Sequence, residues 1–182
     1  GLYPNAFCVI VQCPTNRRYG MVLHSDGAGS KSIVNHLMFK ETGDPSWFKY
    51  NAADVIAMNL DDVICVGATS ENGKVPFYFS NTVGINKFNM DKEKVLTVLF
   101  SGYKEYISKL EEYGVVIQDA GGETADLVDQ IGTAVFDGNL RGYVRLDRVI
   151  DGSRIKPGDF IVGLRSDGQS KLEDRENSGL MS

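Results

Sequence analysis

Three short stretches of the sequence carry residues that could bind a phosphorylated ligand through a metal ion. The first is Asp26–Lys31, in which Gly27 and Gly29 permit a tight turn and Lys31 supplies a positive charge. Backbone N–H groups freed in such a loop form an anion site. Asp26 would repel a phosphate unless a divalent cation bridged the two, so the loop indicates a nucleotide-phosphate and metal site. The loop has neither the P-loop spacing nor the dinucleotide-binding G-x-G-x-x-G spacing.

The second and third stretches add carboxylates. The second, Asp54–Ala68, belongs for most of its length to an expected helix, and its Asp61–Asp62 pair lies among apolar residues. In Gly121–Asp126, two glycines precede Glu123, so the backbone can approach a ligand closely there. Carboxylates gathered around one point hold Mg²⁺. Together with a cation such as Lys31, they would suffice to position and stabilise a phosphoryl transfer.

The histidines and cysteines suggest no further chemistry. His24 and His36 lie far apart in the sequence and show no zinc spacing, so both are interpreted as structural residues. Cys8, Cys13 and Cys65 form no C-x-x-C pair. Buried thiols in a reduced, cytoplasmic protein are the simplest interpretation.

Composition excludes several classes of protein. The chain has 182 residues and a formal net charge of −5, from 19 basic and 24 acidic residues. This balance argues against a general nucleic-acid binder. The sequence contains no run of about 18 apolar residues that could cross a bilayer, so no membrane association is expected. The length suits one domain and the beginning of another. We expect an ATP-binding and dimerisation domain over residues 1–158 and the start of a truncated second domain over residues 159–182.

The elements that must position these stretches alternate between strands and helices. Helices are expected over Ser46–Val66 and from an Asn89 cap to Gly114. Residues 32–45 are interpreted as a lid-like or connecting segment with one or two helical turns. Strands are expected over Phe7–Val11, Tyr19–Ser25, Val75–Thr82, Val115–Gln118, Thr133–Phe136, Tyr143–Leu146 and Phe160–Leu164.

The expected arrangement is an α+β fold. The segment Asp137-Gly138-Asn139 is interpreted as a turn that joins two strands. Because several strands follow one another directly, the pattern predicts a mixed or antiparallel sheet with two main helices on one face. An α/β fold is the alternative.

In their order and spacing, the three stretches resemble the N-terminal half of the phosphoribosylformylglycinamidine cyclo-ligase family, also called aminoimidazole ribonucleotide synthetases. The resemblance extends from Gly1 to about Leu164. The wider superfamily includes selenophosphate synthetase, thiamine-monophosphate kinase and a hydrogenase maturation factor, and most of its enzymes use ATP and Mg²⁺. The resemblance implies a homodimer in which two N-terminal sheets join into a barrel, with active sites near the interface.

The resemblance also implies an activity and a set of site residues. The activity is an ATP-dependent ligation in purine biosynthesis that closes the imidazole ring of aminoimidazole ribonucleotide from formylglycinamidine ribonucleotide. Lys31 and Asp62 would be catalytic, and Asp26, Asp62 and Glu123 would hold metal. The nucleotide-binding residues would come from two loops: Asp26, Gly27, Gly29, Ser30, Lys31, Gly121, Gly122, Glu123 and Thr124.

Some residues depart from the family pattern and keep other functions open. Asp61 replaces the usual asparagine of an Asn-Asp pair, and Leu127–Gln130 replaces a Pro-Gly-Met run. One alternative is another ATP- and Mg²⁺-dependent member of the superfamily, selenophosphate synthetase-like or small-molecule kinase-like. The other is a nucleotide-binding dimerisation module without turnover. Without a second domain, the fragment by itself is expected to be inactive.

Overall fold

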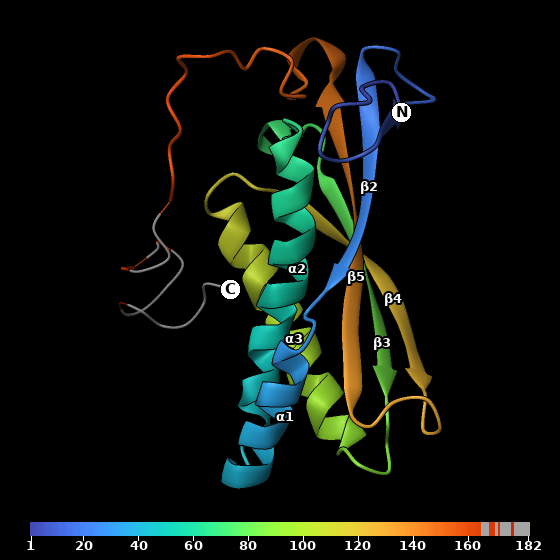
Figure 1. The fold of residues 1–182 in the computed structure, drawn as a ribbon. Helices are drawn as coiled ribbons and strands as arrows, with labels where there is room; N and C mark the ends of the chain where they lie inside the picture. The colour runs from blue at the N-terminus through green and yellow to red at the C-terminus, as the bar shows by residue number, and fades with distance from the viewer. Residues whose placement is uncertain (165–167, 170, 172–175, 177–182) are drawn as a thin grey trace. The chain divides into compact units, whose positions relative to one another are not determined.

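The computed structural model describes residues 1–164, 168, 169, 171 and 176. Residues 1–152 form one compact unit and residues 153–182 form another. All helices and strands found among the described residues belong to the first unit (Figure 1). No helix in the described part of the chain combines the length and the apolar character that a membrane span requires. The expected functional division at residue 158 stays a prediction.

The first unit is built on a five-stranded sheet in the order β1-β2-β5-β3-β4. The strands β3 and β4 run parallel, and the other neighbouring strands run antiparallel. The strand bounds are Ile10–Gln12 for β1, Tyr19–Gly27 for β2, Phe77–Ile85 for β3, Ile117–Asp126 for β4 and Ala134–Arg145 for β5. The predicted α+β class with a mixed sheet is therefore confirmed.

Three α-helices accompany the sheet: α1 (Lys31–Thr42), α2 (Phe48–Cys65) and α3 (Lys92–Glu111). The helices α2 and α3 lie side by side against one face of the sheet, and α1 packs beside α2 (Figure 1). The expectation of two helices was therefore incomplete. Residues 32–45 are not a lid-like connection, since most of them belong to α1, which ends at Gly43 in a left-handed conformation.

The helix α2 approaches the sheet closely because β5 presents glycines to it. A Cβ atom added at Gly138 would lie 2.6 Å from the Phe79 ring and 2.8 Å from a methyl group of Val55. A Cβ atom at Gly142 would lie 2.7 Å from a methyl group of Val63. Real side chains do not tolerate such contacts, so these glycines fix the distance between α2 and the strands beneath it. That distance determines which α2 side chains can reach β2.

The strand β5 corrects one sequence-based interpretation. The segment Asp137-Gly138-Asn139 was expected to be a turn between two strands, but β5 is continuous from Ala134 to Arg145. Gly138 stays in the sheet because its missing side chain leaves room for Val55 and Phe79 above it.

Two further predictions, a helix cap and a strand, are also wrong. Asp91, not Asn89, caps α3: its carboxylate accepts a hydrogen bond from the Lys94 N–H, at 3.2 Å. Asn89 instead donates to the Gly132 carbonyl oxygen, at 2.9 Å. The segment Phe160–Leu164 forms no strand, and its large side chains are exposed.

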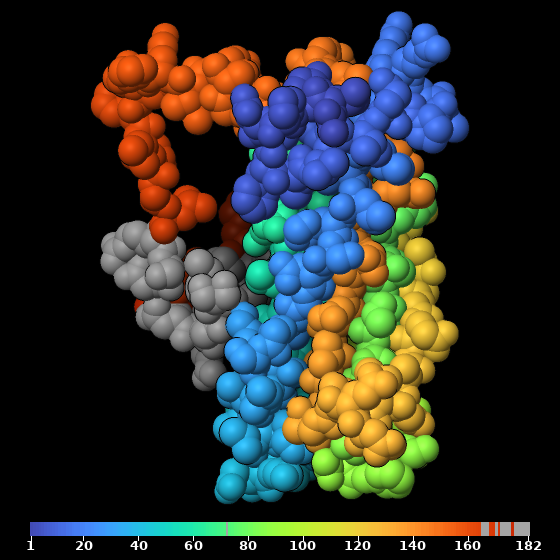
Figure 2. Space-filling view, turned by 45° about the vertical axis from the view of Figure 1, so that its right-hand side comes forward, coloured from blue at the N-terminus to red at the C-terminus, as the bar shows by residue number. Residues whose placement is uncertain are grey.

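The face of the sheet opposite the helices is open. Figure 2 shows β2, β5, β3 and β4 next to one another at the surface. Along β5, buried residues on the helix side alternate with partly or fully exposed residues on the open side. The sheet of a single chain has two edges and is not closed into a barrel.

Candidate functional site

A cluster of one histidine and two aspartates lies between β2 and α2. His24 and Asp26 are two residues apart on β2, so they share the face that α2 covers. His24 Nε2 lies 2.8 Å from Asp62 Oδ2 on α2 and 3.9 Å from Asp26 Oδ2. One ligand atom from each of the three side chains can be chosen so that all lie within 4.8 Å of one another. The structure thus joins two predicted metal ligands, and it adds a histidine.

Sequence reasoning missed His24 because it looked for histidine spacings typical of zinc sites. The available signal was the strand period of two residues, which places His24 on the same face as Asp26. The contact with Asp62 depends on the packing of α2 and could not be read from spacing alone.

The backbone around Asp26 is held in place by hydrogen bonds. The Gly27 N–H donates to Asp26 Oδ1 at 2.7 Å. Asn59 is fully buried on α2, and its side-chain amide N–H₂ donates to the Asp26 carbonyl oxygen at 3.0 Å and to the Val55 carbonyl oxygen at 2.8 Å. Asn59 therefore ties the end of β2 to the helix that carries Asp62.

The glycine loop leads from β2 directly into α1. The Ala28 N–H donates to the Phe136 carbonyl oxygen at 2.9 Å, which anchors the loop to β5. Gly29 has a φ of 54°, a conformation that glycine adopts readily. Ser30 precedes the first turn of α1 without a side-chain capping bond. The N–H groups of Lys31, Ser32 and Ile33 donate to carbonyl oxygens of the loop and of the first turn. The positive end of the helix dipole still makes this the kind of place where proteins bind phosphate.

Lys31 has a partner that was not predicted. Its Nζ lies 2.6 Å from Asp54 Oδ1 on α2. The Lys31 side chain is 37% exposed and that of Asp54 is 15% exposed, so the pair lies at the surface end of the α1–α2 contact. To reach a bound phosphate, Lys31 would have to exchange this carboxylate for the ligand.

The third predicted stretch lies on another part of the sheet. Asp26 aligns with Gly138, Gly138 with Asn81, and Asn81 with Gly122, so a single row crosses β2, β5, β3 and β4. With neighbouring strands about 4.8 Å apart, Gly122 lies roughly 14 Å from Asp26. Gly121 and Gly122 are thus residues of an edge strand and do not contact the first loop.

Glu123 faces the open side of the sheet. It aligns with Thr82, which is exposed, whereas the neighbouring Asn81 and Val83 are buried on the helix side. Thr124 is the next residue along β4 and aligns with Val83. The expected metal set of Asp26, Asp62 and Glu123 is therefore not assembled within one chain.

Negative charge accumulates around the cluster. Burial, with the neighbouring Asp62 charge, raises the pKa of Asp61. Burial, with the Asp26 charge, raises the pKa of Asp137, which is paired with Gly27 in the sheet. Acidic groups this close repel one another, and a divalent cation would relieve that repulsion. The carboxylate oxygens of Asp26 and Asp62 are of the kind that bind Mg²⁺, whereas His24 adds a nitrogen donor.

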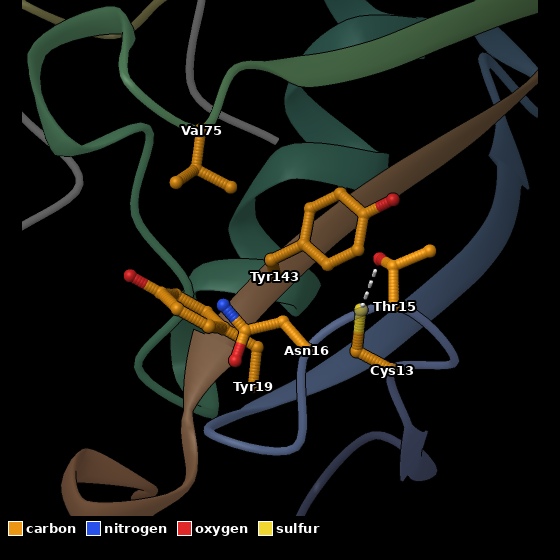
Figure 3. Close-up of a pocket in the computed structure, with 6 residues that line it drawn as sticks. All are labelled: Cys13, Thr15, Asn16, Tyr19, Val75 and Tyr143. Carbon is orange, nitrogen blue, oxygen red and sulfur yellow. Dashed lines mark hydrogen bonds between the residues drawn. The ribbon is translucent and has the colours of Figure 1, made fainter.

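A shallow pocket lies elsewhere, near the start of β2, and contains none of the predicted site residues. Figure 3 shows its lining: Cys13, Thr15, Asn16, Tyr19, Val75 and Tyr143. The Thr15 hydroxyl lies 3.4 Å from Cys13 Sγ, and this hydrogen bond lowers the pKa of the thiol. We assign no function to this pocket.

Curated relatives share sequence with most of the chain. Three proteins named phosphoribosylformylglycinamidine cyclo-ligase match 82% of it: from Methanococcus maripaludis strain C5 at 32% identity, and from Methanocaldococcus jannaschii and Pyrococcus furiosus at 33%. The chain covers 37%, 37% and 39% of these relatives, respectively, so it spans less than two fifths of their length.

The solved structures that this chain resembles are more distant in sequence. T. maritima PurL complexed with ADP is 15% identical with a TM-score of 0.48, over 84% of this chain and 21% of that one. The hydrogenase maturation protein HypE in complex with ATP is 17% identical with a TM-score of 0.44, over 77% of this chain and 34% of that one. The family assignment therefore relies on sequence.

A family model supplies that assignment. The model for the N-terminal domain of AIR synthase related proteins matches residues 5–144, a range that contains the glycine loop, the Asp62 helix and β4. Together with the curated relatives, this match shows that the chain belongs to the AIR synthase related family through its N-terminal domain.

Proposed function

We propose that the chain is the nucleotide-binding half of an ATP-dependent cyclo-ligase that makes aminoimidazole ribonucleotide from formylglycinamidine ribonucleotide. The observation that carries the proposal is the meeting of Asp26 and Asp62 beside a glycine loop that opens α1. The names of the relatives at 32–33% identity suggest the particular reaction.

Each part of the site has a role in this proposal. Asp26 and Asp62 would hold Mg²⁺, which, when bound, neutralises charge on the nucleotide phosphates. The positive end of the α1 helix dipole would attract the phosphate oxygens. Lys31 would leave Asp54 and stabilise the charge of the transferring phosphoryl group, as a mobile ammonium can. Asn59 would keep Asp26 and Asp62 at a fixed separation through its bond to the β2 backbone.

The reaction divides into two bond exchanges. The formyl amide oxygen attacks the γ-phosphorus of ATP, and ADP leaves. The amidine-side nitrogen then attacks the activated formyl carbon, the phosphorylated oxygen leaves as phosphate, and the imidazole ring closes. Phosphorylation turns a poor leaving group into a good one, which explains the need for ATP.

A second candidate is another ATP- and Mg²⁺-dependent member of the superfamily with a different acceptor. Asp61 favours it, because this carboxylate stands where cyclo-ligases have an amide and adds a charge next to Asp62. The remaining alternative, a nucleotide-binding module without turnover, would bind ATP but transfer no phosphoryl group.

We further propose that the protein is a homodimer joined through the open face of the sheet. The side chains of Val11, Leu23 and Val135 lie on that face and are 42%, 64% and 41% exposed. A second sheet would cover these apolar groups. It would also bring Glu123 of each copy to the interface, since Glu123 is on the same face.

The deciding experiment offers the protein that carries this chain ATP, Mg²⁺ and formylglycinamidine ribonucleotide. Aminoimidazole ribonucleotide and ADP should appear in equal amounts. ADP without this product would favour the second candidate, and ATP binding without ADP would favour the binding module.

A further inference from the structure

The His24–Asp26–Asp62 cluster differs from a site made of oxygen ligands only, because it offers an imidazole nitrogen. His24 Nε2 is 2.8 Å from Asp62 Oδ2 and 3.9 Å from Asp26 Oδ2. A first-row metal ion binds nitrogen and oxygen at about 2.0–2.2 Å. Ligand atoms around such an ion lie about 3 Å apart at right angles and about 4 Å apart on opposite sides. Both measured separations fall within that span.

The orientation of His24 is a second observation that points to a ligand. Its Nε2 atom is buried and makes no hydrogen bond, although Asp62 Oδ2 is only 2.8 Å away. An imidazole held there for a hydrogen bond would direct its N–H at the carboxylate oxygen. Two ligands of one ion instead direct their lone pairs at a shared point, and the close but misaligned pair fits that arrangement.

Asn59 supports the same location. This side chain is completely buried, and its Oδ1 has no hydrogen-bond partner. Its amide nitrogen is bonded to the Asp26 backbone, so an unpartnered oxygen lies next to the strand that carries two of the three ligands. A buried polar atom without a partner has a cost that a bound ion or its water would remove.

We propose that His24, Asp26 and Asp62 form a mixed nitrogen–oxygen site that binds a first-row transition-metal dication, such as Mn²⁺, Co²⁺ or Zn²⁺, in preference to Mg²⁺. Imidazole is a favourable ligand for the borderline-soft metals and adds little for Mg²⁺, which prefers oxygen. Three protein ligands leave open positions for water or for phosphate oxygens. The site shares Asp26 and Asp62 with the proposed function and in that respect rests on it, but it needs no nucleotide.

Binding of Co²⁺ to the untagged, metal-free 182-residue chain, without nucleotide, tests the proposal. The absorption of Co²⁺ reports its ligands, and the sequence has only two histidines, so a hyperfine-shifted imidazole proton signal in NMR can be assigned by substitution. We expect one bound ion with a shifted imidazole signal. Competition should show Zn²⁺ displacing Co²⁺ at far lower concentration than Mg²⁺ does.

His24→Gln and His36→Gln form a matched pair of variants. His36 is buried on α1 and belongs to no cluster of possible metal ligands among the described residues. His24→Gln should remove the shifted signal and weaken Co²⁺ binding at least about tenfold, while Mg²⁺ binding changes less than about threefold. His36→Gln should leave both unchanged, and far-UV circular dichroism should show that each variant is folded.

Two results would overturn the proposal: Co²⁺ binding that survives His24→Gln, or competition in which Mg²⁺ is as effective as Zn²⁺. The proposed nucleotide function fails separately. If the unaltered chain binds Co²⁺ through His24 but does not bind ATP, the result counts against the nucleotide site alone. If it binds ATP but shows no Co²⁺ binding through His24, the result counts against the mixed metal site alone.

Discussion

In the proposed nucleotide site, Asp62 is the residue whose substitution should weaken metal-dependent binding most. Its carboxylate contacts His24, and its charge adds to the effect of burial in raising the pKa of Asp61. The change Asp62→Asn keeps the size of the side chain and removes that charge. We expect Mg²⁺-dependent ATP binding to weaken about tenfold or more, a loss of about 1.4 kcal/mol or greater. Calorimetric titration with and without Mg²⁺ measures it.

Asp91→Asn is the matched control for that substitution. Asp91 caps α3, its side chain is 39% exposed, and its contacts are with Lys94. Asparagine also caps helices well, so both stability and ATP binding should change little. Equal ATP binding by the unaltered chain with and without Mg²⁺ would contradict the idea that a metal bridges Asp26 to phosphate.

Residue types and the family resemblance together predicted part of the candidate site. Residue chemistry indicated Asp26 and the Asp61–Asp62 pair, the resemblance singled out Asp62, and the structure brings Asp26 and Asp62 together. The same reasoning could not find the Lys31–Asp54 pair or the contact of His24 with Asp62, because both depend on where α2 packs. Residue type indicates the chemistry available to a side chain, and tertiary packing determines which residues that side chain contacts.

At the scale of elements, the sequence-based prediction failed for a helix that buries polar side chains and exposes apolar ones. The helix α1 buries Ser32, Asn35 and His36 and exposes Ile33, Val34 and Leu37. Asn35 donates to the side-chain oxygen of Asn51 on α2 at 2.9 Å, so polar contacts hold the two helices together. A hydrophobic pattern cannot reveal such a helix. The helix expected over Ser46–Val66, in contrast, is present as α2, and its apolar residues Ala52, Val55, Ile56 and Val63 are buried.

The glycines of β5 allow α2 to pack close to the sheet, and the substitution Gly138→Ala tests this role. The added methyl group would collide with Phe79 and Val55. We expect a loss of about 1–3 kcal/mol in the free energy of unfolding, the usual cost of overpacking. The midpoint of urea denaturation measures the change.

Gly132→Ala is the control for overpacking, because a Cβ atom there would have no neighbour within 4 Å. Its effect should lie within about 0.5 kcal/mol or be slightly stabilising, since alanine reduces the freedom of the unfolded chain. If Gly138→Ala and Gly132→Ala lower the free energy of unfolding by the same amount, the close approach of α2 to β5 does not require glycine at position 138.

At the scale of the whole molecule, the two predicted halves of the nucleotide site lie on opposite faces of one sheet. Asp26 faces α2, whereas Glu123 faces the open side roughly 14 Å away across two intervening strands. A single chain cannot bring them together without unfolding the sheet. If Glu123 takes part in the site at all, its partner must come from another copy or from a part of the protein beyond this unit.

Association through the open face therefore makes a definite prediction for Leu23→Glu. Leu23 is 64% exposed on that face, and a buried carboxylate opposite its own copy would oppose pairing. We expect sedimentation velocity to show a dimer for the unaltered chain and a monomer for this variant. Phe88→Glu, at a position 78% exposed outside the sheet, should remain a dimer. A dimer that survives Leu23→Glu would place the interface elsewhere, and Glu123 would then have no reason to meet a second copy.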